Sequence, residues 1–222
     1  MIQFLDLIAA ILVRGVVKLC SFFPVSWVLK VGRFFGGFIY YVSGDRKRIT
    51  YANLRAAFCD SKTPEELKKM TKMVFKRLAE AFSELLCVIR VDQKYIDKYV
   101  EIENADYMHQ AVKKGKGVIF LTAHFGNWEL SAVVSSFKGY PLYVLARDQK
   151  MKKLYELVNL LRESKGLKVI RKGMTTRYIV KALHEGKVIG MVADQNGGPN
   201  GVIANFFGRP ASTTDGACRF AA

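Results

Sequence analysis

The second half of the chain alternates short apolar runs with amphipathic stretches, and this alternation restricts its possible folds more than any other feature. Strands are expected at the short runs, 99–102, 117–121, 142–146, 167–170 and 187–193. Helices are expected where apolar residues recur at helical spacing between them, at 105–114, 128–137, 151–164 and 175–184. Strands that alternate with helices across short, glycine-containing connections are typical of a parallel sheet. The pattern therefore predicts an α/β fold, with a mainly parallel sheet flanked by helices.

A longer amphipathic helix is predicted ahead of these units. Thr63 is a good helix cap, Pro64 suits the first turn, and Glu66 follows the cap at the spacing of a capping box. This helix is expected to run to about Val88, and its apolar face indicates packing rather than chemistry. A shorter helix is expected at 51–58.

The N-terminal segment carries two apolar blocks, at 4–13 and 25–42, that are interrupted by charged residues. Neither block offers the roughly 18 uninterrupted apolar residues of a clear membrane span. Spaced lysines and arginines suit helices that lie in a bilayer interface, with a pair of core helices in a soluble protein as the alternative. We therefore expect a membrane-associated helical segment at 1–42, followed by an α/β domain at 43–222.

The protein has a formal charge of +16, from 35 basic and 19 acidic residues. Nucleic acid, an anionic membrane face and an acidic carrier protein would each suit such a charge. The apolar N-terminus favours the membrane over nucleic acid. A basic cluster at 45–48 follows the apolar blocks, and it suits an anionic leaflet or forms a solvated loop.

Polar residues follow the predicted strand at 117–121, at the sheet edge where α/β proteins bind ligands. His124 ends the strand, Asn127 is a good cap for the next helix, and Glu129 falls in its first turn. A histidine there can present one ring nitrogen to a substrate while Glu129 accepts the other N–H. The two would act as a general base and its orienting carboxylate, unless His124 is a core residue and Glu129 a solvated one.

Arg147, Arg171 and Asp194 follow other predicted strands at the same edge of the sheet. An arginine there suits a phosphorylated acceptor, or the oxyanion that forms when a thioester carbonyl is attacked, unless both arginines are ordinary surface cations. The four cysteines and three histidines lack the spacing of a metal site, so neither a metal nor a cofactor is expected.

Two motifs make the chain resemble a known family. The first, from His124 to Glu129, resembles the His-x4-Asp/Glu motif of the lysophospholipid acyltransferase superfamily, and its fuller form Thr-Ala-His-Phe-Gly-Asn-Trp-Glu resembles the late acyltransferases of lipid A biosynthesis. The second lies about 70 residues downstream, at 193–198 and 205–214. The resemblance extends from the apolar N-terminus to Gly216.

The resemblance implies a membrane-associated enzyme that moves a fatty acyl chain from a thioester of acyl carrier protein or coenzyme A to a hydroxyl of a lipid A precursor. It implies that His124 is the general base and that Glu129 is its partner carboxylate. A covalent enzyme intermediate is not expected, because the chain has no Gly-x-Ser-x-Gly motif to supply a serine. The substrate-binding positions that we expect are Asn127, Arg147, Arg171, Asp194 and Gln195.

The family resemblance also implies a location at the bacterial inner membrane, with the catalytic domain facing the cytoplasm. Because the family continues with further strands, the domain at 43–222 is expected to be incomplete at its C-terminus. Phe206 and Phe207 suit the wall of an acyl-chain groove, or core packing. The alternatives are a lysophospholipid or other glycolipid acceptor, and a basic membrane-binding protein without catalysis.

Overall fold

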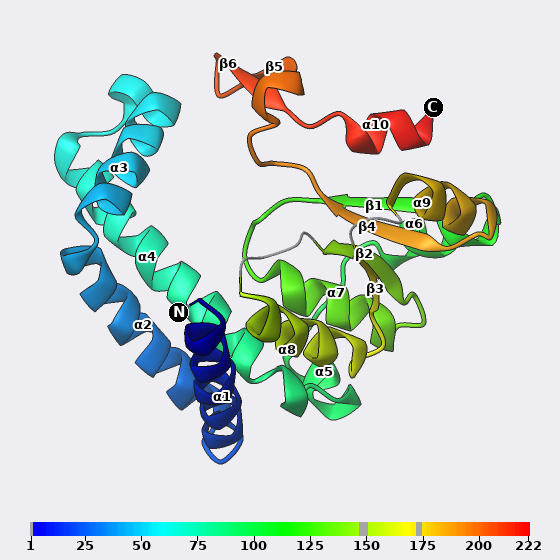
Figure 1. Cartoon of the computed structure of the whole chain (residues 1–222). Helices are drawn as coiled ribbons and strands as arrows, with labels where there is room; N and C mark the ends of the chain where they lie inside the picture. Colours follow the sequence, from blue (N-terminus) through cyan, green and yellow to red (C-terminus); the bar gives the residue numbers. More distant parts are fainter. Residues whose placement is uncertain (1, 147–150, 172–174) are drawn as a thin grey trace.

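A small parallel sheet lies at the centre of the computed structural model, which describes residues 2–146, 151–171 and 175–222 (Figure 1). Its strand order is β1-β4-β2-β3, and the strands are β1 (Val118–Thr122), β2 (Leu142–Ala146), β3 (Lys168–Arg171) and β4 (Val188–Val192). This confirms the predicted α/β class with a parallel sheet. Because β4 pairs with β1, with Thr122 opposite Val192, the residues that follow these two strands emerge side by side.

Helices cover both faces of the sheet and also form an arm beside it (Figure 1). The helices are α1 (Ile2–Cys20), α2 (Val25–Val42), α3 (Gly44–Phe58), α4 (Pro64–Leu86), α5 (Gln93–Tyr99), α6 (Ala105–Lys113), α7 (Trp128–Phe137), α8 (Lys152–Glu163), α9 (Thr175–His184) and α10 (Gly216–Ala221). Short 3-10 turns are η1 (Cys59–Ser61), η2 (Val88–Arg90) and η3 (Gly198–Asn200). A separate antiparallel hairpin joins β5 (Val202–Phe206) to β6 (Arg209–Thr213).

The hydrophobic core lies on both faces of the parallel sheet. On one face, Ile96 of α5 and Val133 of α7 pack with Leu142 of β2. On the other face, Ile179 of α9 packs against Ile189 of β4, and α10 contributes partly buried residues to the same cluster. The sheet is therefore covered by helices on both faces, as parallel sheets require. The carboxyl ends of its strands form the edge of the sheet that we call the open edge.

Helices α2 and α4 lie along each other and form the long arm on the left of Figure 1. The predicted start of α4 is confirmed, because Thr63 and Glu66 make a complete capping box. Glycines allow the two helices to approach closely: a Cβ on Gly36 would lie 2.6 Å from the backbone oxygen of Phe75. A larger residue at Gly36 would therefore force the two helices apart.

Helix α1 packs against α8 and contributes a buried carboxylate to it. The Asp6 side chain is only 5% exposed, and it accepts hydrogen bonds from the backbone N–H groups of Lys153 (2.8 Å) and Leu154 (3.1 Å). The residue before α8, Met151, provides no side-chain cap of its own. Asp6 thus caps the first turn of α8 from another helix, in place of a local N-cap.

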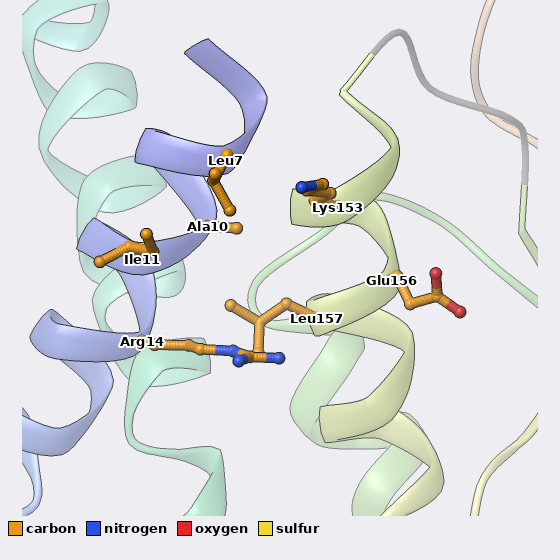
Figure 2. Close-up of a pocket in the computed structure, with 7 residues that line it drawn as sticks. All are labelled: Leu7, Ala10, Ile11, Arg14, Lys153, Glu156 and Leu157. Atoms are coloured by element: carbon orange, nitrogen blue, oxygen red, sulfur yellow. The ribbon is translucent and has the colours of Figure 1, made fainter. Parts of the chain in front are cut away.

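A cavity of about 210 Å³ lies between α1 and α8 (Figure 2). Leu7, Ala10 and Ile11 of α1 and Leu157 of α8 give it apolar walls, and Arg14 lies at one end of the stretch that Figure 2 shows. It is lined by residues of these two helices alone and does not include His124.

The N-terminal segment forms α1, α2 and the turn between them. Its apolar side chains are widely exposed, among them Phe4, Ile11, Leu12, Phe22, Trp27, Phe34 and Tyr41. Within the described ranges, every helix falls short of the combined length and apolar content needed to cross a membrane.

Two local expectations differ from the structure. The strand predicted at 99–102 is wrong, because Tyr99 ends α5 and the chain after it is irregular. Asp92 caps α5 by accepting a hydrogen bond from the Tyr95 backbone N–H (2.8 Å), and this local signal outweighs the short apolar run. The helix predicted at 51–58 begins earlier, at Gly44, so the basic cluster lies in the first turns of α3 rather than in a loop.

Candidate active site

His124 and Asp194 meet at the open edge of the sheet, two residues beyond β1 and β4 respectively. Oδ1 of Asp194 lies 2.7 Å from Nδ1 of His124, and its Oδ2 accepts the backbone N–H of His124 at 2.8 Å. The side chains are 30% and 33% exposed, so a substrate can reach the ring while Asp194 holds it. One carboxylate therefore fixes both the backbone and the ring of the histidine.

The environment of Asp194 favours its ionised form. Burial alone would raise its pKa, but the hydrogen bonds from the ring and the backbone N–H of His124 outweigh burial and lower the pKa below its usual value. An ionised Asp194 accepts a hydrogen bond from an N–H at Nδ1, and this tautomer of a neutral ring leaves the Nε2 lone pair free to act as a base.

Two further residues contact the imidazole of His124. The side-chain nitrogen of Gln195 lies 3.4 Å from Nε2, a long contact that a substrate hydroxyl can replace. The indole of Trp128 meets the ring edge to face, with centroids 4.8 Å apart. The ring is thus held at Nδ1 by Asp194 and on one side by Trp128, while Nε2 makes the long contact with Gln195.

The turn between His124 and α7 is shaped by Gly126 and Asn127. Gly126 has a φ of 60°, a left-handed conformation that a residue with a Cβ adopts at a cost. Oδ1 of Asn127 accepts the N–H of Leu130 (3.0 Å), which confirms the predicted cap. Its Nδ2 donates to Glu84 of α4 at 2.7 Å, so both ends of this amide bind protein groups; a substrate contact of Asn127 stays a prediction.

Glu129 does not make the predicted contact with His124 within the described structure. Its carboxylate pairs with the guanidinium of Arg162 in α8, through Nε at 2.9 Å and also through a terminal nitrogen. The side chains are 15% and 20% exposed, and Asn159 also accepts a hydrogen bond from Arg162. The orienting carboxylate on the ring is Asp194, because β4 lies beside β1 and brings it to Nδ1.

Sequence reasoning missed two residues that brace the site. Arg162 lies in the last turn of α8 and Glu84 near the end of α4, and neither position carries a motif. Helical spacing placed both on predicted helices, but their partners lie 33 and 43 residues away in the sequence. Only the packing of α4, α7 and α8 reveals these contacts.

The two predicted arginines fall where the structure gives no side chains. Arg147 lies outside the described residues. Arg171 ends β3, beside the end of β2, and its side chain is outside the description. In the described ranges, no three His, Cys, Asp or Glu side chains gather as metal ligands.

The hairpin of β5 and β6 is attached directly to the residues that hold His124. The backbone of Asn196, which follows Gln195, forms a bridge with Thr213, and Thr214 donates from its hydroxyl to the backbone oxygen of Ala193 (3.3 Å). At the other end of the hairpin, Phe206 and Phe207 are 62% and 55% exposed. Core packing is therefore the wrong interpretation of these aromatics, which remain open to an apolar ligand.

Phe207 also lies beside α3, because the centroid of its ring is 5.9 Å from that of Phe58 in this helix. Phe125, directly after His124, is 89% exposed, and Leu121 in β1 is 59% exposed. Exposed apolar side chains therefore lie directly beside His124 and at the far end of the hairpin that is attached to its site. Such a combination suits a substrate with hydrocarbon chains and a reacting hydroxyl.

Comparison with known proteins agrees with this chemistry. A search of curated proteins gave no match. The family model described as bacterial lipid A biosynthesis acyltransferase matches residues 2–222, which is essentially the whole chain. The protein therefore belongs to the bacterial lipid A biosynthesis acyltransferase family, and it is an acyltransferase.

Proposed function

We propose that the protein transfers a fatty acyl chain from the thioester of acyl carrier protein or coenzyme A to a hydroxyl of a lipid A precursor at a membrane surface. The family supports lipid A as the product class. The contact of His124 with Asp194, at 2.7 Å, is the observation that carries the chemical part of the proposal.

In the proposed reaction, His124 acts as a general base. Asp194 keeps the proton on Nδ1, and Nε2 takes the proton from the acceptor hydroxyl as its oxygen attacks the thioester carbonyl. The tetrahedral intermediate then breaks its carbon–sulfur bond and releases a thiolate. The imidazolium returns its proton to that sulfur, so the histidine ends in its starting state and no acyl-enzyme forms.

The negative charge of the oxyanion requires a hydrogen-bond donor near the thioester carbonyl. We assign this role to the side-chain amide of Gln195, supported by its position 3.4 Å from Nε2. Arg147 and Arg171 remain our candidates for the phosphates of the acceptor or for the oxyanion, since Arg147 comes directly after β2 in the sequence and Arg171 is the last residue of β3. Glu129 acts indirectly, because its ion pair with Arg162 joins α7 to α8.

The membrane part of the proposal rests on the exposed surface of the N-terminal helices. Large apolar side chains of α1 and α2 face outward, and lysines and arginines are spaced among them. Such helices bind in the interface of a bilayer with anionic lipids. We infer an association with the bacterial inner membrane on its cytoplasmic side, where acyl thioesters are available.

Acyl transfer by the purified protein tests this function. The assay combines an acyl carrier protein thioester or acyl-CoA with a lipid A precursor, and mass spectrometry detects the added chain. We expect the wild type to acylate the precursor and His124→Ala to lose at least a hundredfold in rate. His184→Gln, which changes a histidine at the end of α9, is the matched control and should stay active.

Two results would overturn the proposal. Acyl transfer at the wild-type rate by His124→Ala would show that His124 is not the general base. Acylation of a lysophospholipid in preference to the lipid A precursor would show a different acceptor with the same chemistry.

A further inference from the structure

A groove of about 490 Å³ lies between α2 and α4, apart from the candidate active site. From α2 it is lined by Lys30, Arg33, Phe34 and Phe38, and from α4 by Lys72 and Lys76. Along α4, these two lysines precede Glu84, which contacts Asn127, by 12 and 8 residues. They therefore lie roughly 18 and 12 Å along the helix axis from that contact.

The groove is strongly cationic. Its lining includes lysines and an arginine and no Asp or Glu. Glu80 of α4 binds Arg33 from outside the lining, so this charge is balanced within the protein. Lys72 donates to the hydroxyl of Tyr41 at 2.7 Å, a neutral partner that leaves its charge in place. The remaining positive charge favours an anionic ligand.

The same groove carries exposed aromatic rings. Phe34 is 73% exposed and Phe38 is 59% exposed, and they follow Lys30 at successive turns of α2. Tyr41 continues this line, and its ring lies 4.7 Å from the Lys72 ammonium. Apolar rings beside cations are typical of surfaces that lie where lipid headgroups meet acyl chains.

A glycine lies where the two helices border the groove. A Cβ on Gly37 would lie 3.3 Å from the Cε atom of Lys76, so a side chain there would press on this lysine. With glycine at this position, the lysines of α4 and the rings of α2 border one continuous depression.

We propose that this groove binds the phosphate headgroup of an anionic phospholipid in the bilayer, with Phe34 and Phe38 against the acyl chains. Lys30, Lys72 and Lys76 supply the charge complementarity. An acidic carrier protein would also meet the charge, but it leaves the exposed rings without a partner. The exposed apolar face continues along α2 to Trp27 (61% exposed). This site does not use His124; it rests on the membrane part of the proposed function and assigns the lipid contact to a defined groove.

Vesicle co-sedimentation of the full chain tests the site. One set of vesicles is pure phosphatidylcholine and the other is an equimolar mixture with phosphatidylglycerol. The groove variant carries Lys30→Gln, Lys72→Gln and Lys76→Gln. The control variant removes the same charge at the exposed α6 end, with Lys113→Gln, Lys114→Gln and Lys116→Gln.

We expect the groove variant to lose roughly a hundredfold in binding to the anionic vesicles, while the control loses several-fold at most. Binding to pure phosphatidylcholine should be nearly equal for all three proteins. Phe34→Ser with Phe38→Ser should weaken binding to both kinds of vesicle. His124→Ala should bind like the wild type, so failure of acyl transfer and failure of this site are distinguishable.

Equal losses in the groove and control variants would overturn the proposal, because they would show that the whole +16 charge acts without a site. Unchanged vesicle binding in the groove variant would overturn it as well. So would a groove variant that binds vesicles normally but no longer binds acyl carrier protein, since the groove would then serve the carrier.

Discussion

The carboxylate of Asp194 holds His124 at two points, with Oδ1 on the ring nitrogen Nδ1 and Oδ2 on the backbone N–H. The two residues are 70 positions apart in the sequence, and the pairing of β1 with β4 brings them together. A carboxylate held this way fixes both the tautomer and the direction of the ring. The proposed base therefore depends on the order of strands in the sheet.

The ion pair of Glu129 and Arg162 should stabilise the fold and act on catalysis only indirectly. Removing one partner of a largely buried pair leaves the other charge without its counterion, so we expect Glu129→Gln to lower the free energy of unfolding by about 3 kcal/mol. Chemical denaturation measures this change. The rate of acyl transfer should fall less in Glu129→Gln than in Asp194→Asn.

The matched control is the double variant Glu129→Gln with Arg162→Gln, which should be more stable than the sum of the single changes predicts. Additive losses would show that the two side chains do not interact. A larger fall in rate for Glu129→Gln than for Asp194→Asn would return the orienting role to Glu129.

Stability should depend on the ionisation of Asp194. Its pKa is lowered in the folded protein, so its contribution is fully present above its unfolded pKa of about 3.9 and is lost as the pH falls through the lower, folded value. We expect the difference in Tm between the wild type and Asp194→Asn to be constant near neutral pH and to shrink below about pH 4. A difference that grows as the pH falls would contradict the sign of this shift.

Phe207 lies in a strained turn at the hairpin tip. It has a φ of 51° and is followed by Gly208 at 72°, which are the conformations of a two-residue hairpin turn that favours asparagine at the first position. We expect Phe207→Asn to be about 1 kcal/mol more stable than Phe207→Ala, since both remove the ring and only asparagine suits this φ. Thermal unfolding compares the two.

The same pair of variants separates strain from function. If the ring contacts an acyl chain, both variants should have a KM for the lipid acceptor that is several-fold higher than in the wild type, despite their different stabilities. A KM that follows stability instead would assign Phe207 a purely structural role.

Asp6 should stabilise α8 from outside. Asp6→Ala leaves the N–H groups of Lys153 and Leu154 without an acceptor, so we expect a loss of about 1 to 2 kcal/mol in the free energy of unfolding. Asp6→Asn keeps an acceptor oxygen and should lose less. Amide hydrogen exchange should show faster exchange in the first turn of α8 for the alanine variant, and unchanged exchange there would contradict the cap.

Local signals in the sequence predicted the fold well. The capping box at Thr63 and the cap at Asn127 are formed by neighbouring residues, so their patterns are visible in the sequence and both are confirmed. The four strands of the sheet alternate with helices as predicted. The strand predicted at 99–102 failed because a short run of this kind also fits the end of a small capped helix, α5.

The partner of His124 was not predicted because it depends on a non-local arrangement. Glu129 is the nearest carboxylate in sequence, and its place in the first turn of α7 made it the natural candidate. Asp194 was assigned to the same edge, but only the order β1-β4-β2-β3 puts it on Nδ1. Arg162, which binds Glu129, carries no sequence signal at all.

The turnover number of Asp194→Asn tests the account most directly. An amide presents an N–H group as readily as an oxygen to Nδ1, so it no longer enforces the tautomer with a free Nε2 lone pair. We predict that kcat falls by roughly a hundredfold to ten-thousandfold, with KM for the lipid acceptor nearly unchanged and the protein still folded at neutral pH. A kcat within a few-fold of the wild type would contradict the claim that Asp194 orients His124 as the base.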